Sequence, residues 1–574
     1  MNKNFLASLS LLMLVVSSVG AQQRQTQDLI LQWGSTDVRY PRNEVPAGQG
    51  NKQWETDAWK GERVNAQAVL WTRQPLKNVR IAVSDLKCGK NVIPASATTA
   101  SFVGYVWTDE LNKDRKSGCS DRPNKADWDS SLVADVLEVR KSLDIEAQCT
   151  QPLWVNIWVP QDIPSGVYKG ALTVSGENFA DVRLPMKINV QKRTLPDPAQ
   201  WVFHLDLWQN PYAVARYYNV PLWSRQHFDI MKPLMQQLAN AGQKVITASV
   251  MHHPWAGQTE DPFDSMVFRM KKIDGSWVYD YTVFDRWVEF MMSLGIDRQI
   301  NCYTLVPWAL KFDYYDQATN RIRFVEAKPG EAAYEDYWFS FLKDFAGHLR
   351  QKGWFEKTTI AMDEREKSMM QKAFDLIFRA DAGYKVSGAG DYYPEIEPKM
   401  YDLCLAYGHT LPDSVREERR RSGKLSTVYT CCIEAYPNTF TFSEPGEASW
   451  LMWHAVAGGY DGYLRWAYNS WTKDPLHDSR FRSWAAGDCY LVYPGSSSIR
   501  MERLVEGTLE FKPFCEYENL SYVEVPGFEP PFEVREYHHQ LHQAFEFRYD
   551  YVEKLKGHKN ELPQEVLDVL KTLM

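Results

Sequence analysis

The spacing of apolar and polar positions divides the chain into two parts with different textures. Residues 22–195 hold short, β-rich apolar runs separated by turn residues, and no helical period of any length appears among them. The clearest runs are residues 64–71, 79–84, 154–159 and 168–174. This pattern predicts an N-terminal β-sandwich over residues 22–195, which ends in a proline-containing linker at 195–198.

From residue 201 onward, apolar runs alternate with stretches of helical period. The predicted strands are 201–207, 244–251, 299–305, 358–362, 385–389, 400–406, 425–432 and 459–466. The predicted helices are 223–241, 284–294, 334–350, 367–380, 412–421 and 447–457, with only a very short one near 395–398. Strand and helix alternating eight times over about 300 residues is typical of a (β/α)8 TIM-like barrel. We assign the barrel to residues 196–500.

Both ends of the chain lie outside these two patterns. Lys3, an apolar run over 5–19 and the small residues before position 22 predict a signal peptide at 1–21. No later segment is apolar for the ~20 residues that a membrane span needs. We therefore expect an exported protein, periplasmic or secreted, without a membrane span. A helix is predicted over 496–509, and residues 501–574 are predicted to form a small C-terminal helical region.

Composition narrows the possible partners. The net charge is −8 and no block of Lys and Arg occurs, so we expect no nucleic-acid partner. The chain also holds 22 Trp and 30 Tyr, which suits stacking on sugar rings, although most Trp residues in any protein serve packing.

Nine cysteines form an odd set without the spacing of a metal site or a disulfide scaffold. Cys88, Cys119 and Cys149 lie in the first domain, where we expect at most one bridge. The other cysteines considered lie mostly in apolar runs and are predicted to be buried thiols: Cys302, Cys404, Cys431, Cys432 and Cys489.

The candidate chemistry centres on two consecutive carboxylates, Asp363 and Glu364. The strand predicted over 358–362 runs directly into them, and buried parallel strands carry functional residues just beyond their C-terminal ends. Position selects this pair, since Asp109 and Glu110 form the same dipeptide in a polar segment without a preceding strand. Consecutive residues of a strand point to opposite faces, so both carboxylates can face one sugar only if the strand twists or ends at Asp363.

Aromatic and polar residues also follow the other predicted strands, and a barrel would gather them at its C-terminal mouth. They include His204, Asp206, Trp208, His252, His253, Trp255, Trp308, Asp391, Tyr392, Tyr393, Tyr407, His409, Tyr429, Glu434, Tyr436, Arg465, Trp466, Tyr468, Asn469 and Trp471. An aromatic pocket with few charges suits a carbohydrate.

Six of these residues are predicted to bind substrate. We expect Tyr393 or Tyr429 to hold a substrate group, and the predicted pocket walls are Trp308, Trp466 and Trp471. His253 is the sixth. His252 and His253 form a possible metal pair, but neighbours on a strand diverge and no third ligand is suitably spaced. We expect neither a metal nor a cofactor.

Three functions fit this pattern. In substrate-assisted glycoside hydrolysis the 2-acetamido oxygen of the sugar attacks the anomeric carbon. Asp363 would then orient the acetamido group, and Glu364 would act as acid and base. In an ordinary retaining glycosidase Glu364 would be the acid/base and Glu434 the nucleophile, with carboxyl groups about 5–5.5 Å apart. That mechanism leaves Asp363 without a role. The third function, a secreted glycan-binding protein, does not explain why a costly acidic pair is kept.

Several motifs resemble those of glycoside hydrolase family 123, the retaining β-N-acetylgalactosaminidases. The resemblance rests on WKGERVNAQ at 59–67, MDE at 362–364 and GYLRWAYNSW at 462–471, with GD at 487–488, YPG at 493–495 and SIRME at 498–502. It implies a β-sandwich, a catalytic barrel and a C-terminal helical region. It also implies that Asp363 orients the acetamido group, that Glu364 is the acid/base, and that the substrate is a glycan with terminal β-linked N-acetylgalactosamine. The chain departs from the family at 507–513, where Pro513 would interrupt a helix.

Overall fold

The computed structural model describes residues 29–47, 50–109, 119, 128–434 and 436–509. The predicted signal peptide at 1–21 and the part of the predicted C-terminal region beyond 509 lie outside these residues. Within them, no helix combines the length and apolar character needed to cross a membrane.

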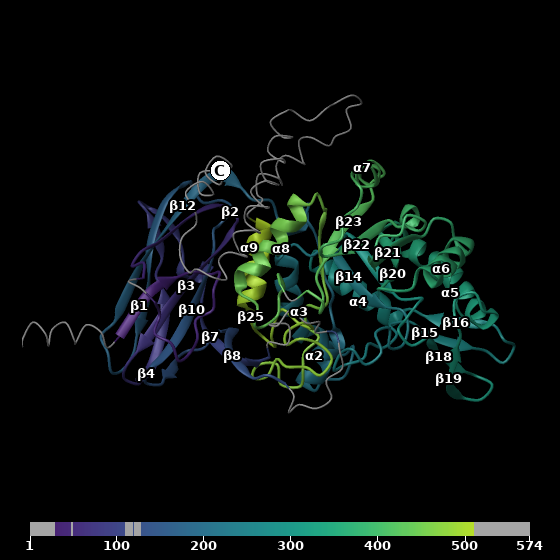
Figure 1. Cartoon of the computed structure of the whole chain (residues 1–574), viewed down its shortest axis with the longest axis horizontal. Helices are drawn as coiled ribbons and strands as arrows, with labels where there is room; N and C mark the ends of the chain where they lie inside the picture. Colours follow the sequence, from purple (N-terminus) through teal and green to yellow (C-terminus); the bar gives the residue numbers. More distant parts are fainter. Residues whose placement is uncertain (1–28, 48–49, 110–118, 120–127, 435, 510–574) are drawn as a thin grey trace, which may run out of the picture.

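An N-terminal β-sandwich is present, as predicted (Figure 1). Its first sheet contains β1 (Leu29–Gly34), β3 (Arg63–Thr72), β10 (Cys149–Trp158), β7 (Thr98–Thr108), β8 (Ser131–Glu138) and β25 (Ser497–Ser498), in that order. The second contains β2 (Trp54–Lys60), β12 (Val182–Thr194), β11 (Gly166–Ser175), β4 (Leu76–Val83) and β9 (Leu143–Ile145), with β5 (Leu86–Cys88) and β6 (Asn91–Ile93) at its side. Alternate residues of β12 are buried, as expected of a strand with one face on a core.

The second domain is the predicted barrel of eight parallel strands. The strands are β13 (His204–Leu207), β14 (Val245–Ser249), β17 (Gln299–Tyr303), β20 (Thr358–Met362), β21 (Lys385–Gly390), β22 (Asp402–Ala406), β23 (Leu425–Tyr429) and β24 (Gly462–Arg465). Each falls within or overlaps its predicted range, so all eight predictions are confirmed. Seven parallel pairings link them. Between β13 and β14 the backbone pairing is reduced to an isolated bridge from Leu205 to Gln243, and side-chain hydrogen bonds add to it, such as that from the Leu207 N–H to the Gln243 side-chain oxygen at 2.9 Å.

The predicted barrel helices are also confirmed. They are α3 (Arg225–Asn240), α4 (Thr282–Ser293), α5 (Ala332–Lys352), α6 (Lys367–Ala380), α7 (Asp413–Arg421) and α8 (Pro445–Ala457). After β21 only a 3-10 turn at Glu397–Lys399 forms, where the prediction placed a very short helix. The sequence analysis missed α2 (Pro211–Tyr218). This helix starts with two usual signals, an Asn210 cap that accepts hydrogen bonds from two backbone N–H groups and a proline in the first turn.

A four-stranded sheet beside the barrel was not predicted. Its order is β16 (Trp277–Asp280), β15 (Phe268–Lys271), β18 (Lys311–Asp316) and β19 (Arg321–Glu326). The strands are insertions after β14 and β17, and each is too short for a clear periodic pattern. One face of this sheet packs on α5, where the ring of Phe312 lies 5.2 Å from Tyr337 and 5.4 Å from Trp338.

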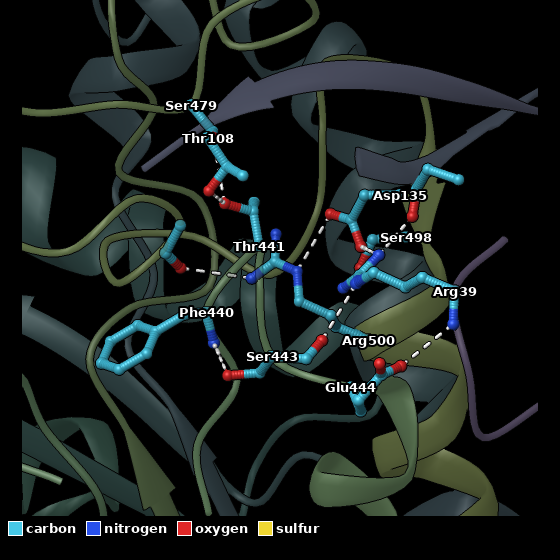
Figure 2. A network of polar contacts seen from close by, with 12 residues as sticks. Arg39, Thr108, Asp135, Phe440, Thr441, Ser443, Glu444, Ser479, Ser498 and Arg500 are labelled. Atoms are coloured by element: carbon cyan, nitrogen blue, oxygen red, sulfur yellow. Dashed lines mark hydrogen bonds and ion pairs between the residues drawn. The ribbon is translucent and has the colours of Figure 1, made fainter. Parts of the chain in front are cut away.

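The two domains share a buried polar interface, centred on Arg500 of α9 (Ile499–Leu509) and Asp135 of β8 (Figure 2). Their side chains form a salt bridge of 3.0 Å, and both are almost fully buried. Arg500 also donates to the carbonyls of Thr439, Gly487 and Tyr490, which belong to the barrel domain. The helix predicted over 496–509 is confirmed, and it crosses the predicted boundary at 500/501. The domain limits themselves stay a prediction.

A disulfide between Cys119 and Cys432 corrects the prediction for two cysteines. Cys432 was predicted to be a buried thiol, and a bridge was expected only within the first domain. The partners are 313 residues apart, with a Cα–Cα distance of 5.2 Å. Sequence spacing carries no information about such a contact, because it depends on how the two domains dock.

Candidate active site

The candidate site lies just beyond the end of β20. The strand stops at Met362, and Asp363 and Glu364 follow in irregular backbone, so the opposite-face rule for strand residues no longer separates them. All five residues of β20 are buried, which fixes the point from which the two carboxylates project. At the end of the neighbouring strand β21, a Cβ added to Gly390 would lie 3.7 Å from the Cα of Glu364, so the two backbones approach closely.

Asp363 is held by two hydrogen bonds, one to each carboxylate oxygen. The indole N–H of Trp308 donates to Oδ2 at 3.1 Å, and the backbone N–H of Glu364 donates to Oδ1 at 2.9 Å. Burial raises the pKa of Asp363, while these two hydrogen bonds and the charge of Arg365 act in the opposite direction. The guanidinium of Arg365 lies 4.4 Å from the centre of the Trp308 ring and so helps to hold the indole in place.

Glu364 is held from the other side of the site. The hydroxyl of Tyr429, the last residue of β23, donates a hydrogen bond to its Oε1. Glu364 keeps exposed surface, yet desolvation is the largest cause that raises its pKa, followed by the negative charge of Asp363. The hydrogen bond from Tyr429 acts in the lowering direction. A carboxyl group with a raised pKa next to a second carboxylate is the arrangement that an acid catalyst needs.

An aromatic cluster of Trp208, Trp255, Tyr303 and Trp466 lies beside the carboxylates. The ring of Tyr303 is 4.5 Å from Trp208 and 5.2 Å from Trp255, and Trp466 is 5.6 Å from Trp255. The charge of Asp363 is one of the causes that raise the pKa of Tyr303, after burial and the charge of Asp206, which places this ring close to the site. Only Trp466 in this cluster is not fully buried, so it is the member that offers surface to a sugar.

Comparison with known proteins agrees with this geometry. The sequence profile of the glycoside hydrolase 123 catalytic domain matches residues 208–515, and that of the glycoside hydrolase 123 N-terminal domain matches residues 33–176. The chain belongs to glycoside hydrolase family 123. It is therefore a glycoside hydrolase, and the non-catalytic alternative is set aside.

A solved structure supports the assignment of this family 123 chain. The structure of a family 123 glycoside hydrolase from Clostridium perfringens, solved in a study of glycolipid glycan hydrolysis, is similar with a TM-score of 0.80. The identity is 25%, and the match covers 90% of this chain and 92% of that one. A comparison with curated proteins found no match.

Two other solved glycosidases are far less similar. A family 5 xyloglucanase from Bacteroides ovatus matches with a TM-score of 0.29 and 10% identity, over 83% of this chain and 100% of that one. A family 39 enzyme from Bacteroides cellulosilyticus matches with a TM-score of 0.33 and 10% identity, over 80% and 82%.

The structure corrects the prediction for Trp471, which does not wall the site of this family 123 enzyme. Its side chain is fully buried, and its indole N–H donates to the carbonyl of Val492 at 2.8 Å. Its ring packs against Tyr217 and Tyr218. Trp471 lies in the loop after β24, and this loop folds back into the core.

Other strand-end residues expected at the mouth are also buried. His204 and Asp206 lie inside the barrel on β13, where the Asn301 amide donates to Asp206 at 3.3 Å. Arg465 forms a buried salt bridge of 2.7 Å with Asp488. Tyr468 and Asn469 are also fully buried. Register accounts for His204 and Asp206, since alternate residues of a barrel strand face the interior rather than the mouth. Tyr468 and Asn469 lie beyond β24, in a loop that is itself buried.

The remaining predicted residues keep partly open positions. Trp308 is 43% exposed, although its indole N–H is engaged by Asp363. Tyr393 is half-buried, with its hydroxyl 3.4 Å from Asp391. His253 is also half-buried and stacks on His252 at 3.5 Å. Roles in substrate binding stay predictions for Trp308, Tyr393, Tyr429, Trp466 and His253.

Glu434, the alternative nucleophile, has a local partner. Its Oε2 accepts a hydrogen bond from the backbone N–H of Cys431 at 2.7 Å, and the Asn438 amide donates to its backbone carbonyl. These contacts shape the loop after β23. The charge of Glu434 nevertheless helps to raise the pKa of Glu364, after the larger raising effects of burial and the charge of Asp363.

Two groups of side chains in the described residues have the spacing of metal ligands. His252, Asp264 and Asp313 bring ligand atoms within 4.8 Å of one another, and the His252 ring already pairs with Asp264 at 3.0 Å. The second group, Cys119, Cys431 and Cys432, contains the disulfide. Neither group includes Asp363 or Glu364.

Proposed function

We propose that the protein is an exported enzyme that releases terminal β-linked N-acetylgalactosamine by substrate-assisted catalysis. The observation that carries the proposal is the separate support of the two consecutive carboxylates. Trp308 donates to Asp363, and Tyr429 donates to Glu364. Two neighbouring acids held by different partners suit two different roles.

In the first step the 2-acetamido oxygen attacks the anomeric carbon while Glu364 protonates the leaving oxygen. Asp363, ionised, orients the acetamido group and stabilises the positive charge of the oxazolinium ion. In the second step Glu364, now a carboxylate, takes a proton from water, and that water opens the oxazolinium ring with net retention. The hydrogen bonds from Trp308 and the Glu364 backbone favour the ionised form of Asp363, as this role requires.

The proposed substrate is the glycan of a glycolipid. Support for this class comes from the similarity to the Clostridium perfringens enzyme, which was studied for glycolipid glycan hydrolysis. The half-exposed surfaces of Trp308 and Trp466 suit the apolar face of a sugar ring.

The test is hydrolysis of three aryl β-glycosides by the purified mature protein. The sugars are N-acetylgalactosamine, N-acetylglucosamine and galactose. Cleavage of the acetamido sugars alone, with N-acetylgalactosamine preferred, is the expected result. Equal cleavage of the galactoside would contradict the oxazolinium route and favour Glu434 as nucleophile. Export is tested separately, by mass spectrometry of the N-terminus of the protein from its native host, which should start after residue 21.

A further inference from the structure

The four-stranded sheet presents an apolar row on the face that points away from α5. Met270 on β15 pairs directly with Val278 on β16 and with Tyr315 on β18, and Tyr315 pairs with Ile322 on β19. Directly paired residues of neighbouring strands project from the same face of a sheet. The four side chains therefore form a continuous row across all four strands.

Two phenylalanines extend this row. Phe268 lies two residues before Met270 and Phe324 two residues after Ile322, so both share its face, and the ring of Phe268 lies 6.1 Å from Tyr315. We call these six residues the apolar face: Phe268, Met270, Val278, Tyr315, Ile322 and Phe324. Phe268 is 51% exposed, Ile322 53% and Phe324 45%, which is high for large apolar side chains that stand together.

The apolar face adjoins the candidate active site. β18 begins at Lys311, in the same loop as Trp308, whose indole donates to Asp363. At the other end the ring of Phe324 lies 6.1 Å from His252, in the loop after β14. Figure 1 shows the sheet at the end of the molecule opposite the β-sandwich. An extended surface that carries the substrate can therefore approach this end without a steric clash with the N-terminal domain.

The charges near this face argue against a polyanion and against an anionic lipid surface. Lys311 and Glu326, paired on the same face, form a salt bridge of 3.2 Å. Asp280 and Asp313 also stand on this face, paired with Phe268 and Phe324, so its acidic side chains outnumber its basic ones. Half of the apolar face (Met270, Val278 and Ile322) is aliphatic and offers no ring on which a sugar could stack, whereas aliphatic and aromatic side chains can both enter a lipid interface. Exposed apolar side chains without a basic cluster suit the interface of a neutral, zwitterionic membrane rather than an anionic one.

We propose that the apolar face rests on the neutral lipid surface from which the glycolipid substrate projects. This inference rests on the proposed glycolipid activity. Shallow insertion of Phe268 and Ile322 would hold the mouth of the barrel at the level of the glycan head group. The contact would raise the local concentration of enzyme at the membrane and leave the chemical step unchanged.

The test compares one double variant with the wild type in three hydrolysis assays and one binding assay. Phe268→Thr with Ile322→Thr removes apolar surface and places a residue of high β-propensity at both strand positions. The matched control is Val139→Thr, a residue of the first domain that is 73% exposed. The substrates are a soluble aryl N-acetylgalactosaminide, the free oligosaccharide of the glycolipid, and the same glycolipid in phosphatidylcholine vesicles. Co-sedimentation with glycolipid-free phosphatidylcholine vesicles measures docking without catalysis.

The double variant should lose about tenfold in activity on vesicles and in co-sedimentation, and retain wild-type activity on both soluble substrates. The control should match the wild type throughout. Unchanged activity on vesicles, or an equal loss on the free oligosaccharide, would overturn the inference, and the latter would identify the face as a glycan site. The inference would also be overturned if sedimentation analysis showed that the wild type is a dimer and the double variant a monomer. If the wild type cleaves none of the substrates, the proposed function fails, and co-sedimentation alone decides the docking.

Discussion

The hydroxyl of Tyr429 donates a hydrogen bond to Oε1 of Glu364, although the two residues come from different strands, β23 and β20. A hydrogen bond to the carboxylate favours its ionised form and so lowers the pKa of Glu364, against the raising effects of burial and Asp363. The proposed acid must be protonated to act, so activity falls as the pH rises through this pKa.

Tyr429→Phe should therefore raise the pKa of Glu364 and move the alkaline limb of the kcat/KM profile to higher pH. The measurement is the pH dependence of aryl N-acetylgalactosaminide hydrolysis. Tyr279→Phe is a suitable control, because its hydroxyl bonds to Ser340, away from the carboxylates. An alkaline limb that stays in place or moves to lower pH would contradict the role of Tyr429.

Replacing Glu364 by Gln should remove proton donation while keeping the size of the side chain. We expect kcat to fall about 10²–10⁴-fold for a poor leaving group. The loss should be much smaller for a dinitrophenyl glycoside, whose leaving group needs no proton. A series of leaving groups of different acidity measures this dependence. An equal loss for every leaving group would show that Glu364 is not the acid.

Asp363→Asn removes the charge that faces the developing oxazolinium ion. Activity should fall about 10²–10³-fold, the usual cost of removing one group that stabilises transition-state charge. Residual activity should show an alkaline limb at lower pH, because the charge of Asp363 no longer raises the pKa of Glu364.

Glu434→Gln is the matched comparison for Asp363→Asn. Under the proposed mechanism this variant should retain most of the activity. The Glu434 side chain accepts a hydrogen bond from the Cys431 backbone and takes no part in the chemical steps. If Glu434→Gln loses as much activity as Asp363→Asn, and no oxazoline intermediate is detected, the ordinary retaining mechanism is the better account.

Trp308→Phe should act on the acid limb of the profile. The indole hydrogen bond lowers the pKa of Asp363, so its loss raises that pKa. Asp363 is needed in its ionised form, and activity falls as the pH decreases through its pKa. The acid limb should therefore move to higher pH, and a rise in KM would report a separate contact of Trp308 with the sugar. An unmoved acid limb would contradict this role of Trp308.

Asp135→Asn should destabilise the protein without altering the site. Asp135 and Arg500 are almost fully buried, and removing one partner of such a pair costs about 3–5 kcal/mol (Figure 2). A lower Tm in calorimetry checks this, with kcat at low temperature near the wild-type value. Asp144→Asn, which removes an exposed pair with Lys77, should leave the Tm almost unchanged. An equal decrease in Tm for both variants would show that the buried pair at the domain interface stabilises the protein no more than an exposed pair does.

Local patterns predicted most of the elements. The barrel strands are short apolar runs bounded by helices of clear period, and the range 358–362 matches β20 residue for residue. The four-stranded sheet was missed because its strands have only four to six residues, too few for a clear periodic pattern. Trp471 was misplaced because residue type does not distinguish a sugar platform from a core aromatic.

The sequence by itself determined the order of strands and helices, and it placed Asp363 and Glu364 directly after a buried strand. These are local properties, set by periodicity over a few residues. Only the tertiary structure decided that Tyr429 supports Glu364, that Trp308 supports Asp363 and that Cys432 bridges to Cys119. The physical reason is that barrel closure and domain docking bring these residues together across the fold, and contacts between distant segments leave no periodic trace in the chain.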